Sequence, residues 1–159
     1  MTEYNLEKLL ETYSEMVVDE YKTAIISLKN QEELYKPPTI DVTHATVLEA
    51  ADHVQRCSSY YGSICKVSGF AVSAFDLVEG RYKQAYRKAL GESTGKNEAA
   101  READAAEATS EELDDLLFFQ SAVKLFAALE RAARVAADSS RKIADLVQSH
   151  HIAEVGNKY

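Results

Sequence analysis

The chain has 159 residues, of which 46% are hydrophobic and 28% charged, and its formal net charge is −8. This composition suits one domain with a hydrophobic core and excludes a disordered or collagen-like chain. Only 6 Gly and 2 Pro are present, too few for the turns of a β-sandwich, so we expect an all-α fold. The chain lacks an apolar run of about 18 residues and a basic-then-apolar start, which predicts a cytoplasmic protein without membrane association.

The first helix is predicted within the N-terminal segment, residues 1–36, from about Glu3 to Leu34. Apolar side chains recur there at alternating steps of three and four residues, which places them on one seam of a helix. The seam consists of Leu6, Leu10, Tyr13, Val17, Tyr21, Ala24 and Leu28. Pro37 and Pro38 cannot continue a helix, so residues 37–42 are predicted to form a linker.

The second helix is predicted to span residues 43–90. Asp41 or Thr43 can cap its N-terminus by accepting a hydrogen bond from a backbone N–H. Gly91 ends it, and the short connection that follows favours turns. The next helix should therefore fold back antiparallel on the second.

The third helix is predicted to span residues 97–152, with residues 153–159 as a flexible tail. The pattern Thr109-Ser110-Glu111-Glu112 is typical of a capping box, so the third helix can be interrupted there. The whole chain is thus predicted to be a single helical domain, an N-terminal helix followed by a helical hairpin.

The two hairpin helices are too long for a compact domain. Helices of roughly 48 and 55 residues would be on the order of 70 to 80 Å long, whereas a compact domain of this size is about 30 Å across. We therefore expect an elongated homo-oligomer. The core stripes are predicted at Val54, Tyr61, Ile64, Ala71, Phe75, Val78, Tyr82 and Ala89 on the second helix, and at Phe118, Ala122, Leu125, Phe126, Leu129, Ala133, Ala136, Ile143 and Val147 on the third.

Small residues follow the opposite side of the second helix: Ser58, Gly62, Gly69, Ser73 and Gly80. Each Gly in a helix interior costs about 1 kcal/mol relative to Ala, so the stripe calls for an explanation. One explanation is close approach of another helix, either the first helix or a neighbouring subunit, and we take the stripe as a candidate oligomer interface. The alternative is that the glycines are tolerated on a solvent-exposed face.

The charge is distributed unevenly around the hairpin turn. Residues 80–96 hold five Lys or Arg against one Glu, and aromatic rings alternate with the cations. Cations can neutralise phosphates and rings can stack on bases, as a single-stranded nucleic-acid surface requires. The candidate nucleic-acid-binding residues are Arg81, Lys83, Tyr86, Arg87, Lys88 and Lys96. Tyr82 belongs to the core stripe, so the alternative is a solvated rim around a packed ring.

Two further charged groups are open to more than one interpretation. Residues 97–115 hold eight Asp or Glu against one Arg, which suits a basic protein partner; the candidate partner-binding residues are Glu98, Glu102, Asp104 and Glu107. A second basic arc on the third helix comprises Lys124, Arg131, Arg134, Arg141 and Lys142. Asp138 and Asp145 can pair with it at spacings of three or four, so it is either a set of intrahelical ion pairs or a phosphate contact.

No catalytic or metal signature is present, so we expect neither an enzyme nor a cofactor. His53 and Cys57 lie one helical turn apart, but zinc takes three or four protein ligands, and Cys65 is roughly 12 Å further along a straight helix. Two buried or partly buried thiols are therefore the expectation.

One stretch resembles a known family. Ile40-Asp41-Val42-Thr43, followed by Glu49-Ala50-Ala51 with Val54 and Ser58, opens a long helix that is predicted to return as a second long helix. This arrangement resembles the T4-type phage recombination mediators (UvsY-like). The resemblance implies a helical oligomer that binds single-stranded DNA and loads a recombinase onto it, in the cytoplasm of a bacterial host. The resemblance does not identify any DNA-contacting residue in this sequence.

Two other functions are consistent with the same sequence. One is a phage assembly or adaptor subunit, for which the acidic surface is natural and nucleic acid plays no part. The other is an acidic inhibitor of a host protein, in which residues 98–115 mimic the charge of a nucleic acid.

Overall fold

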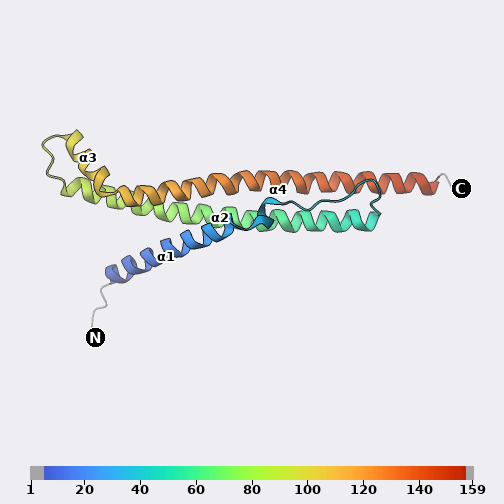
Figure 1. The fold of residues 1–159 in the computed structure, drawn as a ribbon, viewed down its shortest axis with the longest axis horizontal. Helices are drawn as coiled ribbons and strands as arrows, with labels where there is room; N and C mark the ends of the chain where they lie inside the picture. Colours follow the sequence, from blue (N-terminus) through green and yellow to red (C-terminus); the bar gives the residue numbers. More distant parts are fainter. Residues whose placement is uncertain (1–5, 157–159) are drawn as a thin grey trace, which may run out of the picture. The chain divides into compact units, whose positions relative to one another are not determined.

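The structure is a computed structural model that describes residues 6–156, with side chains from Val18 to Ala153. Its helices are α1 (Leu6–Lys29), α2 (Val47–Glu92), α3 (Glu98–Ala108) and α4 (Ser110–Gly156), with a 3₁₀ helix η1 (Glu32–Tyr35) between α1 and α2. Residues 6–156 contain no β-strand, which confirms the all-α prediction (Figure 1). Within these residues no helix is both long enough and apolar enough to cross a membrane.

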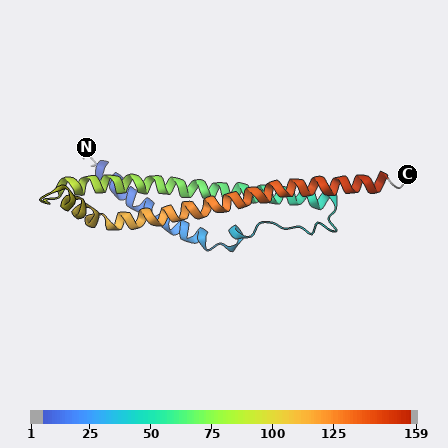
Figure 2. The same ribbon diagram turned by 90° about the horizontal axis from the view of Figure 1, so that it is seen from above.

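The internal contacts divide the chain into two compact units. The first unit comprises residues 1–30 and 70–124, and the second comprises residues 31–69 and 125–159. The helices α2 and α4 contribute to both units, and in each unit they lie side by side in the two views of Figures 1 and 2. The antiparallel pairing of two long helices is therefore as the sequence predicted.

Helix α1 ends earlier than its apolar pattern predicted. Instead of reaching Leu34 it stops at Lys29, where the backbone N–H of Asn30 is shared between the carbonyls of Ile26 and Ser27. Lys29 supplies a cation in the last turn, which complements the helix dipole. The chain then makes the single turn of η1, whose carbonyl at Leu34 accepts a 2.8 Å hydrogen bond from the Tyr60 hydroxyl on α2.

Helix α2 begins later than predicted, and neither Asp41 nor Thr43 caps it. The Asp41 carboxylate accepts a 3.0 Å hydrogen bond from the backbone N–H of Thr43, so these residues form a local turn instead. The cap is Thr46: its backbone N–H donates to the Glu49 carboxylate at 2.8 Å, and the Glu49 N–H donates to its hydroxyl at 3.2 Å. This reciprocal pair is a capping box, which the sequence pattern Thr46-Val-Leu-Glu49 could have revealed.

In the first unit α1 packs against the α2–α4 pair. Tyr21 and Phe70 place their ring centroids 4.7 Å apart, the Lys29 ammonium lies 4.5 Å from the Phe118 ring centroid, and Lys22 forms an ion pair with Asp115. Of the predicted seam on α1, the side chains of Leu6, Leu10, Tyr13 and Val17 lie outside the described side chains. The buried residues are Val18 and Ile25 from α1, Ala71, Ala74 and Val78 from α2, Ala105 from α3, Thr109 between α3 and α4, and Phe119 and Ala122 from α4.

In the second unit, residues 36–46 form an extended strap along α2 and α4 (Figures 1 and 2). The core beneath is narrow and consists mainly of small side chains. Its buried residues are Ala50, His53, Cys57, Ile64 and Ser68 from α2, and Phe126, Ala133, Ala137 and Ser140 from α4. The predicted core stripes are confirmed in that none of their residues is exposed, although His53, Cys57 and Phe119 are more deeply buried than most of them.

The connection between α2 and α3 is held by side chains. The Ser93 hydroxyl donates to the Asp104 carboxylate at 2.7 Å and accepts from the Gly95 N–H at 3.1 Å. The Asn97 side chain accepts from the Ala100 N–H at 2.8 Å and caps α3. These bonds fold α3 back onto the end of the hairpin.

The predicted third helix is interrupted at Thr109, where the capping-box pattern placed an interruption. Thr109 does not cap α4 with its side chain, because its buried hydroxyl donates backward to the Ala105 carbonyl at 2.8 Å. Helix α4 then continues to Gly156, so residues 153–156 of the predicted tail are helical; the remaining three lie outside the described residues.

The connection at Gly95 generates a prediction. A Cβ atom there would lie 2.7 Å from the Arg101 backbone nitrogen and 2.9 Å from the Ala100 carbonyl carbon. Gly95→Ala should therefore lower the free energy of unfolding by about 1 to 3 kcal/mol, because α3 must shift. The measurement is urea unfolding followed by circular dichroism.

The matched control is Gly62→Ala in the interior of α2. A Cβ at Gly62 meets nothing within 4 Å, so this variant should gain about 0.5 to 1 kcal/mol from helix propensity. Equal unfolding midpoints for Gly95→Ala and the wild type would contradict the close approach.

Candidate nucleic-acid interface

The predicted basic residues lie in the first unit, on the last turns of α2 and in the loop after it. Arg87 and Lys88 are exposed on α2, and Lys96 is exposed in the loop. None of these three forms an ion pair with a residue in the part of the chain that the structure describes. Together they present three positive charges to solvent, and we call them the tip cations.

The other two predicted cations are more constrained. The Lys83 ammonium lies 2.8 Å from the Glu79 carboxylate one turn earlier, in an exposed ion pair. Arg81 is half-buried. Because surface ion pairs of this kind contribute little energy, Lys83 can exchange Glu79 for a phosphate, but its charge is already partly neutralised.

Two tyrosines share the last turns of α2 with Arg87 and Lys88. Tyr82 and Tyr86 are both half-buried, and their ring centroids lie 6.0 Å apart with an interplanar angle of 37°. This distance is within the range of favourable aromatic pairs. Both residues are thus partly accessible to solvent, and stacking on a base requires an accessible ring.

The four acidic candidates differ in what their side chains do in the structure. Glu98, Glu102 and Glu107 are exposed on α3. Asp104 is exposed too, but its carboxylate accepts the Ser93 hydroxyl and holds the loop. Asp104 therefore has a structural role that the sequence could not reveal, because the two residues are eleven positions apart.

The small-residue stripe on α2 faces solvent. Ser58, Gly62 and Gly69 are exposed in the second unit, and Ser73 and Gly80 in the first. A Cβ at any of the three glycines would meet nothing within 4 Å. The sequence left two explanations open for this stripe, α1 or a neighbouring subunit. The described contacts of α1 are with Phe70, Phe118 and Asp115 rather than with the stripe, and contact with a neighbouring subunit stays a prediction.

The second basic arc on α4 carries one ion pair, between Arg141 and Asp138 at 3.6 Å. Lys124 in the first unit, and Arg131, Arg134 and Lys142 in the second, are exposed. The intrahelical pairing that the sequence offered as an explanation is thus present at one position. The other exposed cations of this arc therefore serve as control positions for the tip cations.

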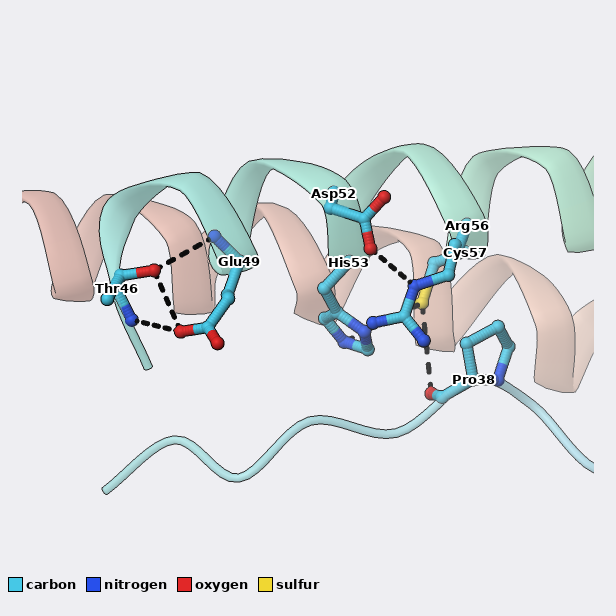
Figure 3. A network of polar contacts seen from close by, with 7 residues as sticks. All are labelled: Pro38, Thr46, Glu49, Asp52, His53, Arg56 and Cys57. Atoms are coloured by element: carbon cyan, nitrogen blue, oxygen red, sulfur yellow. Dashed lines mark hydrogen bonds and ion pairs between the residues drawn. The ribbon is translucent and has the colours of Figure 1, made fainter. Parts of the chain in front are cut away.

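A polar network that the sequence analysis did not anticipate lies beneath the strap (Figure 3). His53 and Cys57 are 4% and 1% exposed. The Cys57 sulfur lies 3.7 Å from the His53 Nε2 atom and donates a weak hydrogen bond to the Pro38 carbonyl at 3.9 Å. On the outer side of the same turns Arg56 pairs with Asp52 at 2.8 Å. Cys57, with His53 beside it, thus joins the strap to α2 at Pro38.

The network beneath the strap has no further ligand for a metal. Among the residues that the structure describes, no three His, Cys, Asp or Glu side chains come together as a metal site. Cys57 is buried and Cys65 partly buried, as predicted for two free thiols.

No protein-family model, curated protein or solved structure matches this chain.

The burial of His53 predicts a dependence of stability on pH. Desolvation lowers the pKa of His53 below its usual value of 6.5, and the nearby Arg56 charge acts in the same direction, while Asp52 opposes both. Below about pH 6.5 the unfolded chain therefore binds a proton that the folded chain resists. The free energy of unfolding should fall as the pH is lowered from 7.5 to about 5.5.

The measurement is urea unfolding across that pH range, above the range in which Asp and Glu titrate. His53→Gln, which keeps a polar side chain of similar length, should remove much of the slope. An equal slope in the wild type and in His53→Gln would assign the pH dependence to other groups.

Proposed function

We propose that this protein is a non-enzymatic accessory protein of DNA recombination or replication that binds single-stranded DNA through the end of α2 and the loop after it. The observation that supports this most directly is the group of tip cations, Arg87, Lys88 and Lys96, which are exposed in the same unit as the Tyr82–Tyr86 pair. The resemblance to the phage recombination mediators points to the same function.

The chemistry assigns a role to each kind of residue. The tip cations neutralise backbone phosphates and release condensed counterions, which contributes salt-dependent and sequence-independent affinity. Tyr86 is the ring for a stacked base, whereas Tyr82, on the core stripe, is the ring that supports it. Stacking of one base on a tyrosine contributes about 1 to 3 kcal/mol with little sequence preference.

Assembly is part of the proposal, because one tip is a weak binding site on a chain with a net charge of −8. The exposed carboxylates of α3 belong to the same unit and oppose a polyanion. An elongated oligomer that presents several tips to one strand gains affinity through effective concentration rather than through stronger single contacts.

The acidic face of α3 is the proposed surface for a basic protein partner, and a recombinase is the partner that the resemblance implies. Glu98, Glu102 and Glu107 are the exposed carboxylates available for this contact. Opposite charge at such a surface chiefly accelerates association. The proposed location is the cytoplasm of a bacterial host.

The test is the salt dependence of binding to an oligo-dT probe, followed by fluorescence anisotropy. Each phosphate contact contributes about 0.7 to the slope of log affinity against log salt for a single strand. Arg87→Ala plus Lys88→Ala should therefore flatten the slope by about 1.4 per engaged subunit. Tyr86→Ala should weaken binding by about 1 to 3 kcal/mol with the slope nearly unchanged, because stacking is not ionic.

The matched control is Arg131→Ala plus Lys142→Ala, which removes the same charge from exposed positions on α4. Its slope should equal that of the wild type. A flattening in the control and not in the tip variant would move the site to α4. Absence of binding at low salt by the intact protein would reject nucleic acid as the ligand.

A further inference from the structure

The second unit contains an open apolar groove of about 950 Å³ between residues 42–48 and the last turns of α4. Four aliphatic side chains on its walls are unusually exposed: Val42 by 47%, Val47 by 40%, Leu48 by 80% and Leu146 by 67%. Isolated exposed aliphatic residues are common on protein surfaces, but a contiguous group that lines one groove is typical of an interaction site.

Helix α4 continues past the start of α2 at this groove. Val47 and Leu48, the first two residues of α2, line the groove together with Leu146 and Val147. Helix α4 runs on for nine more residues, to Gly156, which is about 13 Å. Figures 1 and 2 show this end of α4 extending beyond the start of α2. The last turns of α4 therefore lack the antiparallel neighbour that covers the helix elsewhere in the unit.

The chemistry of the groove narrows the choice of occupant. Its lining contains no Asp, Glu, Lys or Arg, and its only ionisable side chains are His150 and His151. A nucleic acid or an anionic lipid surface would find no Lys or Arg there. Two copies of a chain with a charge of −8 repel each other, and an uncharged surface is where they can approach at least electrostatic cost.

We propose that this groove is the contact surface for a second copy of the same chain. The copies pack about a two-fold axis, so that the exposed Leu48 and Leu146 of each enter the groove of the other. An apolar groove beside an amphipathic helix accepts another such helix. With two-fold symmetry each copy covers the exposed end of α4 in the other copy. This inference rests on the oligomeric part of the proposed function and is independent of DNA binding.

The test is analytical ultracentrifugation of the full chain across micromolar concentrations. The wild type should sediment as a dimer or larger, and Leu48→Glu plus Leu146→Glu should raise the dissociation constant of this contact at least tenfold. Both leucines are exposed in the single chain, so the glutamates are accommodated in a folded monomer, which circular dichroism verifies. If the double variant still formed the symmetric contact, that contact would bury four Glu carboxylates, two from each copy, without partners.

The matched control is Val135→Glu, an aliphatic residue of α4 that is 65% exposed in the same unit and does not line the groove. It should leave the mass unchanged. A monomeric wild type would overturn the proposal, and so would an unchanged mass in the groove variant. Loss of mass in Gly69→Leu alone would move the contact to the small-residue stripe of α2. Oligo-dT binding is measured separately, so an oligomer that ignores DNA rejects the proposed function and leaves the groove contact standing.

Discussion

The narrow seam between α2 and α4 is the constraint on which the rest of the structure depends. Most of its fully buried positions carry Ala, Ser or Cys, and the only aromatic rings buried completely are Phe119 and Phe126 among the side chains that the structure describes. Small side chains allow two helices to approach closely, but each contributes little apolar area. Two long helices joined in this way need additional chain to cover them, and each unit has its own cover.

The two covers are held by different interactions. In the first unit α1 is held by ring contacts and by the Lys22–Asp115 ion pair. In the second unit the Tyr60 hydroxyl holds η1 at its Leu34 carbonyl, Cys57 beside His53 bonds to the strap at Pro38, and the Thr46–Glu49 capping box ends the strap. Because the buried His53 lies beneath the strap and its pKa is lowered by burial, the strap is the cover that protonation of His53 would disturb.

Much of the fold follows from periodicity and from the residues that break helices. The apolar spacing identified the helices that became α2 and α4, and Gly91 and Thr109 lie close to real boundaries. The errors lie where side chains bond to nearby backbone. Asp41 could equally cap a helix or close a turn, and it closes a turn. The signal that decides between the two is the spacing of Thr46 and Glu49, which form the capping box five residues later.

The candidate sites were predictable to the extent that their chemistry is local. The tip cations are visible as a charge cluster, and the Lys83–Glu79 pair follows from a spacing of four. The Ser93–Asp104 bond and the groove beside Leu48 and Leu146 bring together residues far apart in the chain, which no local pattern reveals.

The tip cations and the apolar groove should respond to salt in opposite ways. Counterion release makes binding at the tip cations weaker as salt rises, whereas an uncharged apolar contact between copies gains from the screening of their mutual repulsion. Salt can therefore separate assembly from DNA binding in this protein.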